Sequence, residues 1–345
     1  MFLHYHKLDP GLRRDDISRA CKQIAMKLEK NLVLLVNLGS PNHLSVGAVR
    51  RFLRRFLGDR RVVGLPRYLW YPILYGIILP LRAPKLFKQY QKIWINGKSP
   101  LVYHSEEQSR ALSAMLQNSD TYCRHAFCYA NPDVVATLAQ AHSEYNITQL
   151  IVVPLYPQFS STTSSAVFDQ VSQFYQDKYY LPEIRFVNSF CSNKLYIDAV
   201  VAKIKHSWVE CGKGDRLLLS YHSLPCAIIA NGDAYYDECM LTSKLIAQSL
   251  GLNENEYMVT FQSKFGRQKW LTPTTSGVLA ELGQQHLAVD IICPGFVSDC
   301  LETLEEIKIT NQQLFEHHGG QRYTYIECLN SDMGLIKALH DIISS

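Results

Sequence analysis

Eight short apolar runs, separated by stretches with helical character, constrain the fold of this chain more than any other feature. Runs of this kind, rich in branched aliphatic residues, suit buried β-strands, and strands that alternate with helices form parallel sheets. The sequence therefore predicts an α/β protein in two halves, each a four-stranded parallel sheet flanked by helices. The two sets of runs are Leu32–Leu38, Cys123–Ala130, Gln149–Pro154 and Glu183–Asn188, then Arg216–Tyr221, Tyr257–Gln262, Leu287–Ile292 and Arg322–Glu327.

The length of the chain also fits two halves, because 345 residues exceed what one hydrophobic core usually serves. We expect an N-terminal extension over residues 1–30, a first half over 31–189 and a second half over 190–330. A last helix over 331–345 could pack on either half.

Composition and charge narrow the class of protein. The formal net charge of +4 is too small to favour a nucleic-acid partner. The ten cysteines are scattered and form no CxxC pair, which is typical of a protein in the reducing cytoplasm and argues against a zinc or iron–sulfur site. The N-terminus lacks the apolar core of a secretory signal. We therefore expect a cytoplasmic protein.

One segment, Tyr68–Leu81, is unusually apolar and aromatic for the surface of a globular protein. It contains two prolines and is shorter than the ~20 apolar residues of a membrane span. Two interpretations stay open. The segment is either a buried helix and loop, or part of an exposed lip over about residues 60–85 that grips an apolar ligand or touches a membrane.

Polar, proline-marked loops follow six of the expected strands, with the sequences NLGSP, YANP, PLYPQFSSTT, YHSLP, FQSKFG and CPGFVSD. Open parallel sheets bind ligands beyond the carboxyl ends of their strands. We therefore expect these loops to line one cleft between the halves. Neither a GxGxxG after the first strand nor a Walker A motif is present, so a nucleotide cofactor is poorly supported.

The last of these loops continues into a helix with opposed faces. After a turn at Pro294-Gly295, Ser298-Asp299 offers an N-cap. At α-helical spacing the aliphatic face holds Leu301, Leu304 and Ile307, and the acidic face holds Glu302, Glu305 and Glu306. Read alone, such acids are more often a capping box or a solvated face than a site.

The position of His222 makes Glu302 a stronger candidate for a functional residue. Both residues lie just beyond a strand end of the same half, so one sheet edge would bring them together. A histidine facing a line of carboxylates is a plausible proton or metal path. The alternative is a histidine that is merely hydrogen-bonded in its loop. Glu305 we assign to the solvated face.

Two further sets of residues could hold a ligand. Residues 261–266 and Trp270 offer aromatic surface to a flat apolar ligand, although they could equally be core aromatics. Arg82 and Lys85, beside the apolar segment, could pair with ligand carboxylates, although isolated cations are usually solvated.

Together these loops resemble the ferrochelatase family, whose members insert ferrous iron into a porphyrin at the end of haem synthesis. The resemblance covers nearly the whole chain from about residue 31, and the SDCLETLEEI form is similar to the proteobacterial branch. The matching motifs, in the family's order, are NLGSP at 37–41, RAPK at 82–85, GKSP at 97–100, LYPQFSSTT at 155–163, YHSLP at 221–225, FQSKFG at 261–266 with Trp270, and PGFVSDCLETLEEI at 294–307.

The resemblance implies two Rossmann-like, chelatase-type halves with a porphyrin cleft between them. It implies that His222 and Glu302 are the catalytic and metal-binding residues, facing each other across the porphyrin. Glu306 would continue the acidic line, and Asp299 would support the site. Porphyrin contact or closure of the lip is implied for Leu38, Arg82, Lys85, Ser99, Tyr156 and Trp270.

The implied substrates are protoporphyrin IX and ferrous iron, and the implied product is protohaem. A related chelatase for coproporphyrin or another metal, and a haem or porphyrin carrier without catalysis, are the alternatives. We also expect a peripheral contact with the inner face of the cell membrane through Tyr68–Leu81.

Departures from the family pattern bear on cofactors. Iron–sulfur members carry a cysteine-rich C-terminal extension, whereas this sequence has only Cys328 in that region, and Ser161 stands where some members have cysteine. We therefore expect no iron–sulfur cluster and no tightly bound cofactor. Cys128 replaces an arginine and Cys300 a histidine of some relatives, and Thr310 ends the acidic line early.

Overall fold

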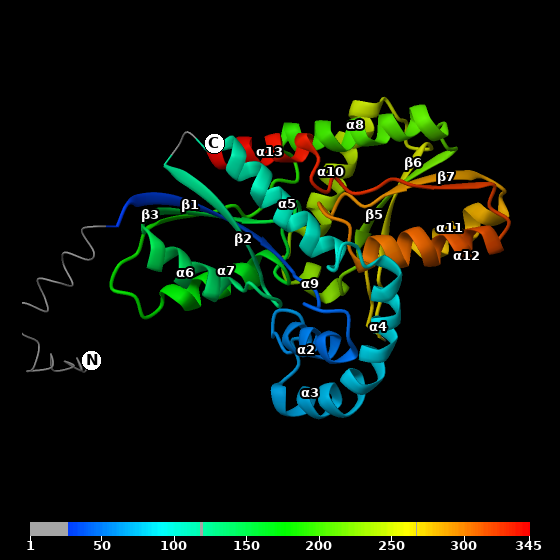
Figure 1. Ribbon diagram of the computed structural model, residues 1–345. Coiled ribbons are helices and arrows are strands. Elements are labelled where there is room, and N and C mark those ends of the chain that lie inside the picture. Colours follow the sequence, from blue (N-terminus) through cyan, green and yellow to red (C-terminus); the bar gives the residue numbers. More distant parts are fainter. Residues whose placement is uncertain (1–26, 118–119, 267) are drawn as a thin grey trace, which may run out of the picture.

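The computed structural model describes residues 27–117, 120–266 and 268–345, so most of the expected N-terminal extension lies outside the described residues. Two four-stranded parallel sheets form the frame (Figure 1), with strand orders β2-β1-β3-β4 and β6-β5-β7-β8. All eight expected strands and the α/β fold class are confirmed. The strands are β1 (Glu29–Asn37), β2 (Thr121–Phe127), β3 (Asn146–Pro154), β4 (Glu183–Phe186), β5 (Arg216–His222), β6 (Tyr257–Gln262), β7 (Ala288–Ile292) and β8 (Arg322–Tyr325).

Both faces of each sheet are covered, as unbroken apolar runs require. In β1 the side chains of Val33 and Leu35 enter one hydrophobic cluster, whereas Leu32 and Leu34 enter the cluster on the opposite face. The helices that supply the cover are α5 (Pro100–Met115), α6 (Val134–Glu144), α7 (Ser164–Tyr175), α8 (Lys194–Cys211), α9 (Cys226–Ala230), α10 (Tyr235–Leu250), α11 (Thr275–Gln284), α12 (Gln312–His317) and α13 (Met333–Ser344).

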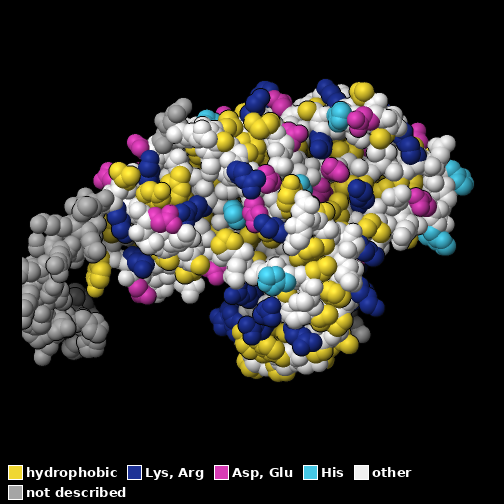
Figure 2. Space-filling model, viewed as in Figure 1, with side chains coloured by type: hydrophobic (Ala, Val, Ile, Leu, Met, Phe, Trp, Pro, Cys, Tyr) yellow, Lys and Arg dark blue, Asp and Glu magenta, His cyan; other side chains and the backbone are white. Residues whose placement is uncertain are grey.

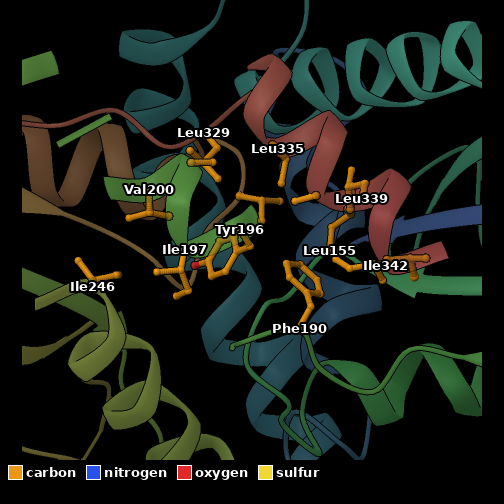
Figure 3. Close-up of a cluster of buried hydrophobic side chains, with 14 of the residues drawn as sticks. Leu155, Phe190, Tyr196, Ile197, Val200, Ile246, Leu329, Leu335, Leu339 and Ile342 are labelled. Carbon is orange, nitrogen blue, oxygen red and sulfur yellow. The ribbon is translucent and has the colours of Figure 1, made fainter. Parts of the chain in front are cut away.

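One large cluster joins the two halves. Figure 3 shows Leu155, from the loop after β3, beside Tyr196 of α8 and Leu339 of α13. The last helix thus contacts both α5 of the first half and α8 of the second. Two acids of the second half add hydrogen bonds to the first, because buried Asp233 accepts from the backbone N–H of Ser161 at 2.7 Å and half-buried Glu238 from that of Phe159 at 2.7 Å. The halves are therefore firmly attached on this side.

The expected lip projects from the frame as a separate group of helices, α2 (Val46–Leu57), α3 (Arg67–Ile73), a π-helical turn η1 (Leu74–Ile78) and α4 (Leu79–Ile93). Tyr68 is 77% exposed and Leu81 is 70% exposed, so the segment is not the buried helix and loop of the first interpretation, and its contact with a ligand or a membrane stays a prediction. Figure 2 shows apolar and basic side chains gathered on this projection. Within the described residues, no helix is long and apolar enough to cross a membrane.

Candidate active site

A cavity of about 80 Å³ lies where the lip meets the second half. Four of the residues predicted for the site line it together: Leu38, Arg82, Ser99 and Glu302. Leu38 comes from the loop after β1, Arg82 from α4, and Ser99 from the start of α5. The cavity is therefore walled by the first half and the lip on one side, and by the acidic segment on the other.

Ser99 has a local reason for its position. Its hydroxyl accepts from the backbone N–H of Val102 at 3.3 Å as the N-cap of α5, and it also hydrogen-bonds the hydroxyl of Ser40. A serine that caps a helix satisfies one of the free N–H groups of the first turn. The two serines thus join the loop after β1 to α5 at the base of the cavity.

Arg82 connects the lip to the second half. Its guanidinium lies over the ring of Phe265, 4.6 Å from the centroid, which is a favourable cation–π distance. Burial lowers the pKa of Arg82 below its ordinary value, and the charge of Glu302 opposes that shift. Arg82 and Glu302 are therefore opposite charges on facing walls of one cavity.

The acidic segment differs from its prediction. Residues Leu301–Asn311 form a π-helix, η2, and not an α-helix. Its N-cap is Cys300, whose backbone N–H donates to the Thr303 hydroxyl at 2.9 Å, so the predicted cap at Asp299 is wrong. Asp299 is buried and accepts from the hydroxyls of Tyr325 and Thr303 and the side-chain amide of Asn330.

The change of helix type also alters which side chains share a face. A π-helix bonds i→i+5, so residues three apart no longer lie above one another as they do in an α-helix. Leu301 and Leu304 pack against the lip helices, whereas Ile307 enters the core beside the second sheet. The predicted common face of these three aliphatic residues is therefore wrong.

Glu302 and Glu306 are both held by the loop after β6. The backbone carbonyl of Glu302 accepts from the side-chain amide of Gln262 at 2.9 Å. The carboxylate of Glu306 accepts from the backbone N–H of Ser263 at 2.8 Å and from its hydroxyl. Burial raises the pKa of Glu306; the Ser263 bonds and the charge of His222 oppose the rise, and Glu302 adds to it. Glu302, Glu306 and His222 thus form one interacting group.

His222 ends β5 and stands opposite Gln262 in the sheet register. Its Nδ1 lies 2.6 Å from the Ser223 carbonyl oxygen. Because a carbonyl can only accept, Nδ1 carries the proton in this bond, and Nε2 of the neutral ring keeps its lone pair free. The side chain is half-buried, and neither it nor Glu306 lines the cavity.

Glu305 contradicts its prediction most clearly. The sequence pattern assigns it to the solvated face, yet it is buried. Its carboxylate accepts from Lys92 Nζ at 2.9 Å and from Gln89 Nε2 at 2.7 Å. Both partners lie on α4, so Glu305 ties the lip to η2. The prediction assumes α-helical faces, and the π-helix turns this residue toward the lip.

Three other candidates lie outside the cavity wall. Lys85 is exposed, Tyr156 packs against the core of the first half, and Trp270 forms a bridge with Pro225. Sequence reasoning in turn missed Gln262 and Ser263. The signal that could have found them is their position in the FQSKFG loop after β6, whose polar residues were overlooked beside its aromatics.

Among the residues that the structure describes, no three His, Cys, Asp or Glu side chains gather as a ready metal site. Cys128 is buried, and Cys300 lines the cavity beside Glu302.

Two solved structures share the fold of this chain. SirB from Bacillus subtilis with Fe3+ superposes with a TM-score of 0.56 at 11% identity, over 91% of this chain and 94% of that one. The structure of CbiX, described as the terminal enzyme for biosynthesis of siroheme in denitrifying bacteria, gives a TM-score of 0.50 at 12% identity, over 91% and 98%. At such low identity these likenesses show the fold alone, and they confirm its chelatase type.

Sequence comparison is far more specific. A curated protein named Ferrochelatase from Pectobacterium atrosepticum is 43% identical over 319 residues, covering 92% of this chain and 99% of that protein. Another of that name from Proteus mirabilis is 44% identical over 312 residues, covering 90% and 96%. The family model described as Ferrochelatase matches residues 30–345. This chain therefore belongs to the ferrochelatase family.

Proposed function

We propose that this protein inserts ferrous iron into protoporphyrin IX to make protohaem, the last step of haem synthesis. The single observation that carries the proposal is the acidic segment at the cavity, where Glu302 lines the wall and Glu306, held by Ser263, interacts with the charges of Glu302 and His222. Metalation needs a base at the ring and a path for protons, and this group supplies both. The match to ferrochelatases over nearly the whole chain supports the same activity.

The reaction releases two protons. As Fe²⁺ bonds to the four ring nitrogens, two pyrrole N–H protons must leave the porphyrin. Glu302, on the cavity wall, and the free Nε2 of His222 are the two bases that we assign to them. The same imidazole and carboxylate are ligand types that suit ferrous iron before insertion. Glu306, with its raised pKa, accepts protons in turn, and Asp299 stays a buried support of the helix start.

The opposite wall would bind the porphyrin. Leu38 offers apolar contact to the ring, Arg82 a cation for a propionate, and Ser99 a polar group of the wall, while Lys85 is an exposed cation farther along α4. Pockets for small-molecule ligands usually measure ~300–1,000 Å³, whereas this cavity measures about 80 Å³. The cavity must therefore widen for the porphyrin to bind. Tyr156 and Trp270 remain predicted contacts of that wider state.

A metalation assay tests the proposal. Purified protein, ferrous iron and protoporphyrin IX under anaerobic conditions should give protohaem, and His222→Ala and Glu302→Gln should lose nearly all turnover. Glu316→Gln, an exposed acid on α12, is the matched control. Near-normal turnover in both site variants would refute the assigned roles. Haem that is retained without any turnover would instead favour a carrier.

Competition between substrates separates the related chelatases. The exposed apolar lip favours a porphyrin with few carboxylates, so we expect protoporphyrin to outcompete coproporphyrin. A preference for coproporphyrin would replace the assigned substrate and leave the reaction type intact.

We also propose that the protein acts at the cytoplasmic face of the membrane through the lip. Exposed Tyr68 and Leu81 lie near α2, whose arginines Arg50, Arg51 and Arg54 are exposed. Apolar groups ringed by cations suit an anionic lipid surface. Co-sedimentation with vesicles containing phosphatidylglycerol should fall in Tyr68→Ser/Leu81→Ser and stay unchanged in Val209→Ser, an exposed site on α8. Equal sedimentation of all three proteins would exclude the contact.

A last part of the proposal concerns cofactors. The protein is expected to work without an iron–sulfur cluster, with iron only as its substrate. Visible absorption and acid-labile sulfide of the purified protein test this directly, because a bound cluster would give both signals.

A further inference from the structure

The buried carboxylate of Glu305 is the one acid of η2 to which the proposed reaction assigns no task. Its side chain is 6% exposed, and it is bound by Lys92 and Gln89, as described above. A buried carboxylate is costly unless it is paired and hydrogen-bonded, and here each of its two oxygens has its own donor on α4.

The partners of Glu305 place it at the seam between the two walls of the cavity. Gln89 and Lys92 are three residues apart and so lie on one side of α4. The same helix contributes Arg82 and Tyr90 to the cavity wall. On the other side of the seam, Glu305 stands between Glu302 and Glu306 in η2. The bonds of Glu305 therefore set the position of the porphyrin-binding helix against the acid–base helix.

Apolar packing alone would leave this position poorly defined. Leu301 and Leu304 of η2 lie against the lip cluster, but contacts between aliphatic side chains have no direction. Two hydrogen bonds to one carboxylate fix both distance and angle, because donors and acceptors must align. Lys92 also remains 49% exposed along its side chain, so water can reach its side of the seam.

We propose that Glu305 is a positioning residue for metalation, acting through Lys92 and Gln89 to hold α4 in register with η2. It touches neither porphyrin nor iron. Its bonds keep the ring nitrogens, held from the lip, aligned with Glu302 on the facing helix. This role rests on the proposed iron insertion and adds to it a requirement that the wall of the lip be fixed.

The test uses full-length protein and separates positioning from folding and from binding. Misplacement of reacting groups by a distant change can cost about 10²-fold, so Glu305→Ala and Lys92→Met should each lower kcat by about 10- to 100-fold. The Kd for protoporphyrin, measured by fluorescence in the absence of iron, should change by less than about threefold, since the porphyrin contacts remain. Lys92→Arg keeps the charge and the donor and should restore most of kcat.

Three controls make the result decisive. Lys88→Met removes an exposed lysine one turn earlier on α4 and should leave kcat unchanged. The double variant Glu305→Ala/Lys92→Met should be no slower than Glu305→Ala alone, because the two changes break one interaction. Thermal unfolding of each variant reports folding separately, and Lys92→Met keeps the test valid if Glu305→Ala is unstable.

The outcomes are distinguishable from failure of the proposed function. An inactive wild-type protein would refute iron insertion itself. An active wild-type protein with normal kcat in Lys92→Met, or with additive losses in the double variant, would refute the positioning role alone. A rise in porphyrin Kd that accounts for the whole loss would make Glu305 a support of the binding wall and would also overturn the proposal.

Discussion

Strands β1 and β5 occupy the same place in two sheets of the same order, yet different kinds of side chain stand at their carboxyl ends. The loop after β1 brings Leu38, Gly39 and Ser40 to the cavity, which are apolar or neutral groups. The end of β5 and the loop after β6 bring the charge of His222 and the hydrogen bonds of Ser263 to the carboxylate of Glu306 in η2. In the proposed reaction one topology thus serves two purposes: the loop after β1 shapes the site, and the second half supplies the groups that we assign to proton transfer.

The loop after β1 and the residues that follow β5 and β6 are also built differently. Gly39 has φ of +90°, and a Cβ there would lie 2.6 Å from the Cβ of Ala130, so the backbone approaches closely where a side chain has no room. The carboxyl ends of β5 and β6 depend instead on side-chain hydrogen bonds. Gln262 accepts from the Ser220 hydroxyl at 2.8 Å while it donates to the Glu302 carbonyl. Shape is therefore fixed by the backbone on one side, and charge by a polar network on the other.

The largest expected effect tests this division directly. Glu302→Gln removes the base on the cavity wall and should lower kcat by about 10³- to 10⁴-fold, within the range of general acid–base contributions. Ser40→Ala, a change in the loop after β1, should lower kcat far less. Steady-state metalation rates of both variants test this expectation. A comparable loss in the two would show that the loop after β1 and the second half do not have separate roles.

Next in size is the effect of Glu306. Because burial raises its pKa above the ordinary 4.5, this carboxyl keeps its proton to a higher pH and can accept one only above that raised value. Activity should therefore fall as pH drops through the raised pKa. Glu306→Gln should lower kcat/KM by about 10²-fold at neutral pH and abolish this acidic limb. A pH–rate profile that keeps the limb in the variant would assign it to another group.

In the loop after β1, a substitution that adds a side chain should act on the stability of the fold. Gly39→Ala would introduce overpacking and an unfavourable positive φ, and should lower the free energy of unfolding by about 1–3 kcal/mol. Gly76→Ala, in the lip, is the control, because among the described residues no atom other than those of its chain neighbours and the backbone of its own helix lies within 4 Å of the place that a Cβ would take at Gly76. Urea denaturation compares the two variants, and equal midpoints would mean that the loop after β1 tolerates a side chain at Gly39.

The smallest effect is expected where the lip meets the substrate. Arg82→Ala should raise the KM for protoporphyrin by about five- to tenfold and change kcat less, because a charged hydrogen bond to a propionate contributes ~1.5–3 kcal/mol before solvent competes. Lys85→Ala, at an exposed position on α4, should change the KM for protoporphyrin by less than Arg82→Ala does. A reversed order would move the propionate site outward along α4.

The frame of the molecule is readable from the sequence, because buried parallel strands leave unbroken apolar runs. The run at Leu32–Leu38 located β1, although the strand begins earlier, at Glu29, where polar residues hide its start. Equivalent strand ends predict that His222 and Glu302 share one end of the second sheet, and the charges of both act on Glu306 there, while their direct pairing stays a prediction. The π-helix η2 did not follow, since hydrogen bonding from i to i+5 leaves no periodic mark in so short a segment.

The same limitation explains the error at Glu305. Its burial depends on Lys92 and Gln89, more than two hundred residues earlier in the chain, and on a helix type that the α-helical wheel does not represent. Local pattern can place an acid on a helix but cannot reveal a partner on a distant element. The exposed lip was undecided for a related reason: an apolar segment looks the same whether it is covered or not.

The whole lip lies within the single connection between β1 and β2, which are neighbours in the sheet. Ser40 and Ser99, at the two ends of the segment that carries the lip helices, are hydrogen-bonded to each other, so the segment between them can vary without disturbing the register of any strand. It forms an interchangeable cassette: exchanging it between relatives should transfer porphyrin preference while the catalytic half remains as it is.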